Sequence, residues 1–447
     1  MWPRARVVSC GASRGGRKGA TQRRRDVRER RCYLVGVGTH RGAIILISDR
    51  CVGLRAVAAL VLALGACAPS QRLSPTVQLL KVASDPSAPL PRPTMPPPAD
   101  TNDARAYYER AVPLIQAGYN LDTADMALYW ASRLDPDWAN PLYARAMLIL
   151  RALRGDLIAA LFRYRSTQRL TLTPQQAQVV DSLVRLAWAH NPLLFTDIDL
   201  FVMPLSPPGA APDPGLEGWR AYKLGDFPRA ESLLAVALRL HPDQVELRIS
   251  RAQSLALLGR YDSAAAEFGV ARDTVRARAV SHASPMLPSL EMFEYAIGIV
   301  RVNQGDFRAA REAFGRALTE NLAFYWAHAR LAGVNLALGD TTAAITELGL
   351  AVEIEPDDPA LRLYNGYVLR LARRYTEAVA ELDVAIRLDP YYAPPHVQLA
   401  LVAQAEGNSA AAADHYRRFL ALAARRDPDR AKVVRALAAL AAPPDSR

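Results

Sequence analysis

The chain is 447 residues long and carries a formal charge of +11, with 51% apolar and 22% charged residues. This composition is ordinary for a globular protein, so it excludes both a multi-span membrane protein and a largely disordered chain. The length allows two or three domains, or one extended repeat array. Aromatic residues make up only 7%, while alanine and leucine are abundant, which favours helix.

The positive charge lies in one part of the chain. Residues 1–66 hold 14 basic and 3 acidic residues and carry the whole excess, because the remainder holds 41 of each. We therefore expect no nucleic-acid partner, since no net charge remains in the body to neutralise phosphates. All four cysteines lie at or before position 67, which excludes a disulfide framework or a cysteine-ligated zinc site downstream.

A targeting signal is the first predicted element. Arg55 precedes an apolar run over 56–66, which has the length of a signal-peptide core and is too short to span a bilayer. The run ends in Leu-Gly-Ala-Cys over 64–67, which resembles the lipobox of bacterial lipoproteins. That resemblance implies cleavage before Cys67 and a lipid anchor on its thiol. We expect residues 1–66 to be a lipoprotein signal peptide with a spurious N-terminal extension.

A stiff linker follows this cysteine. Residues 84–100 contain seven prolines, a density that prevents helix and favours extended polyproline conformation. We expect residues 67–103 to form the lipidated cysteine and a proline-rich linker between the membrane and the body of the protein.

From about residue 104 the pattern is helical, and its clearest units repeat every 34 residues. In each of these units a glycine lies five residues before a small alanine, and a large apolar residue lies four residues after that alanine. In one unit Arg373 replaces the glycine. Glycine can end the first helix of a pair in a left-handed conformation, and alanine lets the paired helices approach closely. One step is longer because of an insertion. The alanines are Ala230, Ala264, Ala310, Ala344, Ala378 and Ala412.

The pattern Gly-Asp-Phe-x-x-Ala, followed by apolar residues and a closing proline, resembles the tetratricopeptide repeat (TPR). Residues 225–242 and 305–318 carry it clearly. Six units match within 211–426, another fits 105–138, and a degenerate unit follows that one. The resemblance implies an all-α fold, a right-handed α–α superhelix (TPR solenoid), and a protein-binding scaffold.

The sequence departs from the repeat in two ways. The period is interrupted, so we expect an N-terminal TPR-like helical block over 104–190, a proline-rich irregular loop over 191–216, a TPR array over 217–426, and a capping helix and tail over 427–447. The tryptophan that the family carries in the first helix is also absent. Its position holds Tyr108, Arg248, Glu294, His328, Arg362 and His396.

The sequence offers no motif for catalysis. The body holds six histidines, none paired at metal-ligand spacing on one helix, and it has neither a nucleophile elbow nor a phosphate-binding loop. His328 and His396 share a repeat position and are expected to pack between helices. We therefore predict a protein that is not an enzyme, with no catalytic residue, no metal and no cofactor.

The groove of the superhelix is the predicted binding surface. In the resembled family the first helix of each repeat lines the concave face, and large aromatic side chains there supply contact area at low entropic cost. The carboxylate-clamping mode of some relatives is not expected, because it uses lysine and asparagine in the groove. The lysines of the body, Lys81, Lys223 and Lys432, lie at none of these positions. The predicted groove residues are Tyr295, Ile299, Trp326, Tyr364, Tyr367, Arg370, Val397 and Leu401, with Met292 and Gln404 beside them.

Together these features predict a membrane-anchored scaffold that binds a partner protein or peptide in the groove. The chain resembles TPR lipoproteins of outer-membrane, pilus or secretion, and cell-wall machinery, and Ala68 after the cysteine suggests a periplasm-facing protein of the outer membrane. One alternative is a hydrolase-like enzyme with a site in 175–216, where Asp197 and Asp199 could hold a cation. The other alternative is a self-assembling structural protein.

Overall fold

The computed structural model describes residues 89–117, 120–149, 174–194, 213–278 and 288–441, and all the regular structure in these ranges is helical. The first block holds α3 (Ala104–Ala117), α4 (Leu121–Leu134), a helical stretch over 139–149, and α6 (Pro174–His190). The array follows as α7 (Pro214–Lys223), α8 (Phe227–Leu240), α9 (Val245–Leu257), α10 (Tyr261–Arg278), α11 (Leu290–Gln304), α12 (Phe307–Glu320), α13 (Tyr325–Ala337), α14 (Thr341–Ile354), α15 (Pro359–Leu371), α16 (Tyr375–Leu388), α17 (Pro394–Ala405), α18 (Ser409–Leu422) and α19 (Arg430–Ala441).

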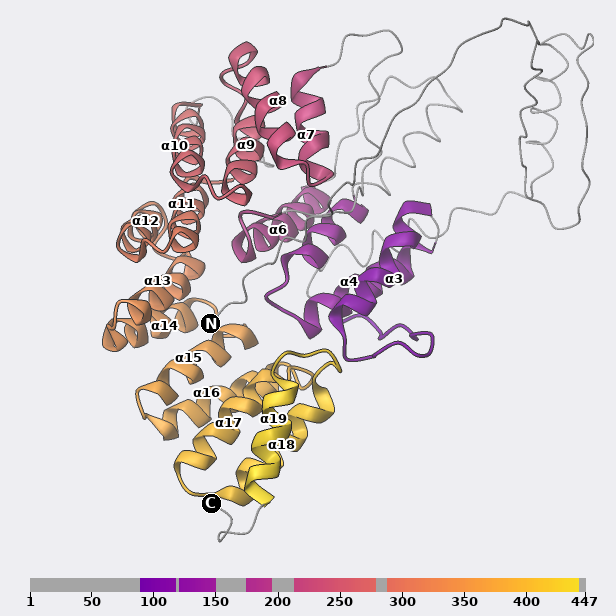
Figure 1. Ribbon diagram of the computed structural model, residues 1–447, viewed down its shortest axis with the longest axis vertical. Helices are drawn as coiled ribbons and strands as arrows, with labels where there is room; N and C mark the ends of the chain where they lie inside the picture. Colours follow the sequence, from indigo (N-terminus) through magenta and orange to yellow (C-terminus); the bar gives the residue numbers. More distant parts are fainter. Residues whose placement is uncertain (1–88, 118–119, 150–173, 195–212, 279–287, 442–447) are drawn as a thin grey trace, which may run out of the picture. The chain divides into compact units, whose positions relative to one another are not determined.

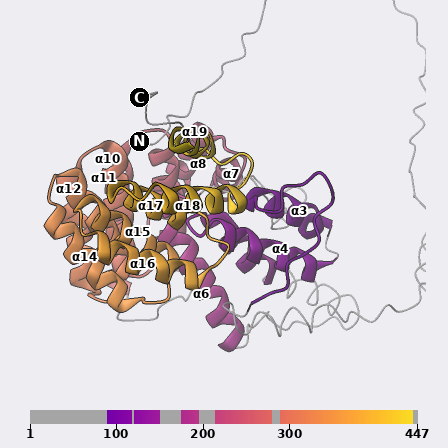
Figure 2. The same cartoon turned by 90° about the horizontal axis from the view of Figure 1, so that it is seen from below.

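The array consists of helix pairs. From α7 to α18 each odd-numbered helix packs on the next, and each pair packs on the following one, as Figures 1 and 2 show. The final helix, α19, packs on α18 within the predicted capping segment. Stacked helical repeats of the TPR kind are therefore the architecture of this part of the chain. No helix among the described residues is long and apolar enough to cross a membrane.

The alanines that mark the period lie where paired helices meet. All six are fully buried, and so are the large apolar residues four positions later, from Leu234 to Leu382. A second column of small residues faces them from the first helix of the pair. A Cβ atom added at Gly298 would lie 2.4 Å from the ring of Phe314, and one added at Gly366 would lie 2.7 Å from Leu382. Only a residue without a side chain permits this approach.

The turn between paired helices explains the Gly-Asp signature. Gly305 and Gly339 have φ angles of 84° and 86°, in the left-handed region. The residue after each, Asp306 or Asp340, accepts a hydrogen bond from the backbone N–H three residues on, at 3.0 and 2.9 Å. Glycine thus ends one helix and aspartate caps the next, as the sequence predicted for the glycine.

Four of the six residues in place of the missing tryptophan form a column of pairs. Each of these four bonds the side chain 19 residues later, on the second helix of the same repeat: Arg362 with Glu381 at 2.9 Å, and His328 with Glu347 at 2.6 Å. The hydrogen bond to Glu347 raises the pKa of His328. The departure from the family pattern therefore exchanges an aromatic contact for a polar one. The other two pairs are Arg248 with Glu267 and His396 with His415.

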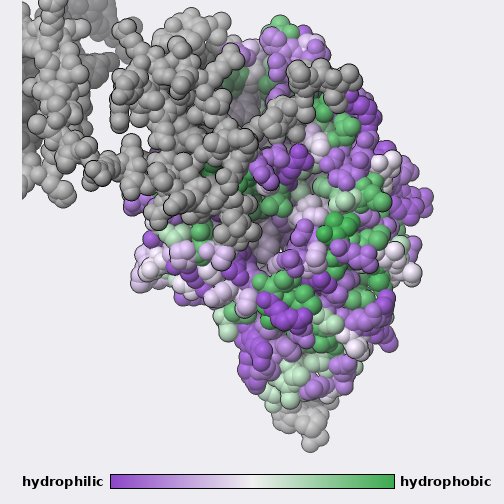
Figure 3. Space-filling view, turned by 180° about the vertical axis from the view of Figure 1, so that it is seen from behind, coloured by the Kyte–Doolittle hydropathy of each residue, from purple (hydrophilic) through white to green (hydrophobic). Residues whose placement is uncertain are grey.

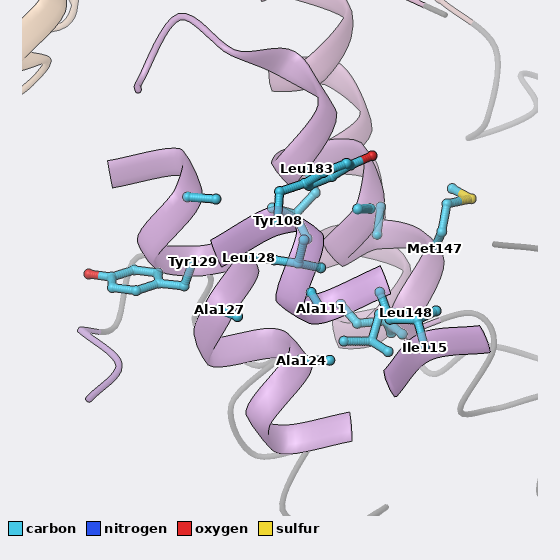
Figure 4. Packing of buried hydrophobic residues seen from close by; sticks show 14 of the residues in the cluster. Tyr108, Ala111, Ile115, Ala124, Ala127, Leu128, Tyr129, Met147, Leu148 and Leu183 are labelled. Carbon is cyan, nitrogen blue, oxygen red and sulfur yellow. The ribbon is translucent and has the colours of Figure 1, made fainter. Parts of the chain in front are cut away.

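The first block has its own core, in which α6 takes part. Figure 4 shows Leu183 of α6 above Tyr108 of α3, with Leu128 of α4 beside them. The same block contacts the last repeats, because Arg133 pairs with Asp389 at 2.9 Å and Trp130 meets Tyr391 edge to face at 5.2 Å between ring centroids.

The described end of the proline-rich linker packs on the first block. The Arg92 Nε atom donates to the Tyr107 hydroxyl at 2.8 Å, its guanidinium lies 4.7 Å from the Trp130 ring, and Trp130 donates to the Leu90 carbonyl at 3.0 Å. Residues 89–103 thus pack on the first block, since an arginine between aromatic rings supplies binding energy that proline spacing does not reveal.

Arg373 tests the energetics of the turn. It occupies the glycine position with a φ of 59°, which an L-residue adopts only at a cost, and its side chain is exposed. Arg373→Gly should therefore raise the free energy of unfolding by about 0.5–1 kcal/mol. The matched change in the opposite sense, Gly339→Ala, should lower it by about 1 kcal/mol or more. Denaturant unfolding of both variants measures the difference, and a destabilised Arg373→Gly would contradict this account of the turn.

Candidate functional site

The predicted groove residues fall into two sets. The first set lies on α11 and α13 and contacts the end of α6. Tyr295 has no exposed surface, and its hydroxyl donates to the carbonyl of Ala189 at 2.6 Å. Trp326 is half-buried, with its ring 4.4 Å from that of His190. Ile299 is half-buried and packs into the core beside Tyr295, and the neighbouring Met292 is buried. We call this part of the groove face the occupied half.

The second set lies on α15 and α17, where every side chain keeps some exposure. Tyr364 and Tyr367 stack with their planes 15° apart and their centroids 6.2 Å apart. The Arg370 guanidinium lies 5.5 Å from the centre of the Tyr367 ring and donates to Gln398 at 2.9 Å. Val397 and Leu401 on α17 are half-buried. We call this part, from Tyr364 to Leu401, the open half.

The segment that covers the occupied half, at the end of α6, is held mainly through its backbone carbonyl groups. Besides the bond from Tyr295, three side chains of the array donate to carbonyl groups at the end of α6 and in the turn after it. Gln253 donates to Pro192 at 2.9 Å, Arg330 to His190 at 3.3 Å, and Tyr222 to Leu194 at 2.5 Å. The last carbonyls of a helix have no partner within it, so they are natural acceptors for such donors.

An aromatic side chain anchors the same segment. Trp188 is buried, and its ring lies edge to face with Phe268 and Phe293, at 6.3 Å from each. Leu193 joins the same core cluster. Burial of a tryptophan and a leucine is worth several kcal/mol, which supports the four hydrogen bonds. We call residues 188–194 the docked segment.

The side chain of His190 fits poorly in the docked segment. Its Nδ1 atom is buried and has no hydrogen-bond partner. Burial, together with the positive charge of Arg330, lowers the pKa of His190 to about 3. The imidazole is therefore neutral at ordinary pH and makes none of the bonds that its buried Nδ1 atom could make.

Carboxylates gather near Arg330. Burial raises the pKa of Asp137, although Arg330 opposes the shift, and burial with the charge of Asp137 raises the pKa of Asp135 to about 6. The pKa of Asp358, which caps α15, is also raised by burial. Both Asp135 and Asp137 nevertheless keep solvent-exposed surface. Carboxylates that are surrounded by protein yet reach water fit the wall of a groove.

Sequence reasoning predicted Tyr295 as a groove residue but missed the other three donors that hold the docked segment. Arg330 stands between Ala329 and Leu331 in the first helix of its repeat, which was the one available signal. Gln253 and Tyr222 gave none, because their partners lie far away in the chain. The cavity of about 510 Å³ lined by Thr341, Ile345 and Leu371 contains no predicted groove residue. It lies between the start of α14 and the end of α15, and we assign it no role.

Other predicted features lie partly or wholly outside the described ranges. Cys67, Asp197 and Asp199 are not among the described residues. Within those ranges no group of three histidine, cysteine, aspartate or glutamate side chains could hold a metal ion. His328 and His396 are buried between helices, as predicted.

The comparisons with known proteins agree with the helix pairs. The tetratricopeptide-repeat family profile matches residues 216–277, 295–359 and 349–393. These matched ranges all lie within the array of helix pairs. No curated protein sequence matches the chain.

Among solved structures, the array is similar to YrrB, a TPR protein with an unusual peptide-binding site. The identity is 18%, the match covers 45% of this chain and 96% of YrrB, and the TM-score is 0.35. It is also similar to PilF of Pseudomonas aeruginosa, at 15% identity over 46% and 88% of the two chains with a TM-score of 0.35. A third similar structure is the C-terminal part of a TPR protein from Cytophaga hutchinsonii, at 13% identity over 46% and 78% with a TM-score of 0.39.

The docking of residues 188–194 should depend on pH through His190. The docked imidazole stays neutral down to a pH of about 3, whereas the released side chain regains an ordinary pKa near 6.5 and takes up a proton. Docking is therefore strongest above pH 6.5 and should weaken by about 1.4 kcal/mol per pH unit between 6.5 and 3. Hydrogen exchange of the backbone amides of 187–194 at pH 7 and pH 5 measures this loss.

The control for that experiment is His190→Ala. The raised pKa values of Asp135 and Asp137 act in the opposite sense, because they favour folding at low pH. Only the difference between wild type and His190→Ala isolates the histidine. The same pH dependence in both proteins would show that another group causes it.

Proposed function

We propose that the protein is a membrane-anchored scaffold that holds a partner protein in the groove of its TPR array. The TPR domain itself is a protein–protein interaction domain, and the observation that supports this groove as the binding surface is the open half. There the stacked Tyr364 and Tyr367, the guanidinium of Arg370, and two aliphatic side chains keep exposure without a covering segment among the described residues. Partly exposed tyrosine and arginine are the residue types that dominate binding energy at interfaces.

The partner that fits this surface is an extended segment or an amphipathic helix. Half-buried Val397 and Leu401 offer apolar contact, while Tyr367 and Arg370 add polar groups at its border. On the face shown in Figure 3, apolar residues lie among polar ones.

The anchor and the location belong to the same proposal. The lipobox-like sequence before Cys67, followed by the proline-rich linker, supports a lipoprotein of the bacterial envelope that faces the periplasm. Ala68 supports the outer membrane, and the resemblance to TPR lipoproteins supports outer-membrane, pilus or secretion, or cell-wall machinery as the setting.

Replacement of Cys67 tests the anchor. The mature protein should begin at an acylated Cys67 and sediment with membranes, whereas Cys67→Ala should stay unprocessed and lack the lipid, because the thiol is the acylation site. Mass spectrometry of the mature N-terminus measures both. An intact mature N-terminus upstream of residue 67 would overturn the lipoprotein proposal.

Replacement of the tyrosine pair tests the groove. A photo-crosslinking amino acid at Tyr367 should capture the partner in intact membranes, and mass spectrometry identifies it. Tyr364→Ala with Tyr367→Ala should then weaken binding of that partner by about 2 kcal/mol or more, as loss of central interface residues does.

The control separates binding from folding. Ala378 is fully buried at a helix contact, so Ala378→Glu should unfold the array. The Tyr364 hydroxyl lies 2.7 Å from where a Cβ atom of Gly333 would be, so the double variant should lose some stability but keep its helical signal. If it unfolds as completely as Ala378→Glu, the tyrosines are structural and the partner binds elsewhere.

A further inference from the structure

We infer that residues 188–194 are an autoinhibitory segment: they fill the occupied half of the groove in cis, and a partner whose helix ends in free carbonyl groups replaces them there. The inference rests on the proposed function, since it describes regulation of the same groove. Three observations carry it.

The first observation concerns which groups of the docked segment the groove binds. Tyr222, Gln253, Tyr295 and Arg330 each donate to a main-chain carbonyl of the segment 189–194. Carbonyl groups are common to all sequences, so these four donors do not require this particular segment. The end of any helix with an aromatic residue in its last turn offers the same acceptors and the same anchor.

The second observation is the imperfect fit of the present occupant. The buried Nδ1 atom of His190 has no partner, and the ring lies against Trp326 and near the charge of Arg330. A buried nitrogen without a hydrogen bond costs binding energy that a partner lacking this histidine would not lose. The groups that face it are Arg330 and Trp326 of α13, with Asp137 near Arg330 from the first block.

The third observation is continuity. Trp326 ends the occupied half on α13, and Gly333 of the same helix touches Tyr364, the first residue of the open half. A partner bound to the open half therefore lies next to the docked segment. Its helix end can extend across Trp326 once residues 188–194 leave.

The experiment uses the segment itself as the probe. A fluorescently labelled synthetic peptide of residues 181–194 is titrated into the purified mature chain, and binding is followed by fluorescence anisotropy. Trp188→Ala removes the anchor of the docked segment and should free the groove, so this variant should bind the peptide with a Kd at least tenfold below that of wild type. A peptide that carries Trp188→Ala should bind neither protein.

The matched control is Trp138→Ala. Trp138 packs in the first block, with its ring 4.7 Å from that of Tyr108. This variant loses a partly buried tryptophan from that core and should bind the peptide no better than wild type does. A gain equal to that of Trp188→Ala would mean that general loosening admits the peptide, and the inference would be wrong.

His190→Ala gives a result in the opposite direction, and it remains informative if Trp188→Ala does not fold. Removal of the unsatisfied nitrogen should hold the segment more firmly, so the amides of 187–194 should exchange at least threefold more slowly and peptide binding should weaken. Faster exchange in His190→Ala would overturn the inference. These measurements use only the chain's own segment and need no partner. They can therefore support the inference even if the open half binds no partner, and they can contradict it even if the open half does bind one.

Discussion

The capture of the α6 carbonyls by side chains of the array is the interaction on which the site depends. A helix end presents acceptors that its own backbone cannot satisfy, and Tyr295, Arg330 and Gln253 supply the donors from three successive repeats. Because α6 also carries Leu183 in the core of the first block, the helix joins that block to the array. The occupied half of the groove is thus a structural joint, and under our proposal it is also a binding surface.

The array can bind α6 on its groove face because each repeat is held together by contacts within its own helix pair. The buried alanine column and the small residues opposite it lie within the helix pairs. At the turn between α15 and α16, Arg373 adopts the left-handed conformation without glycine. Arg362 and Glu381 form an ion pair where the family has an aromatic contact.

The fold could be predicted from the sequence because its signals are local. A glycine five residues before an alanine, at a fixed period, specifies a turn and a close helix contact, and the structure has both at Gly305 and Ala310. Seven of the eight predicted groove positions also follow from the period, and Tyr364 lies one place past a repeat position. The covering of these residues by α6 does not follow from the period. The bond from Tyr295 to Ala189 spans 106 residues, and no periodic pattern encodes a contact of that range. For the same reason the packing of Arg92 between Trp130 and Tyr391 was missed, although each residue is visible in the sequence.

The seating of residues 188–194 on the groove face is the central claim, and photo-crosslinking within the chain tests it most directly. A benzoyl-phenylalanine in place of Trp326 lies where the His190 ring contacts the groove, at 4.4 Å between ring centroids. After irradiation of the purified full chain and proteolysis, the account predicts an intramolecular crosslink from position 326 to the peptide that contains residues 188–194. Crosslinks from position 326 to other segments, with none to this peptide, would contradict it.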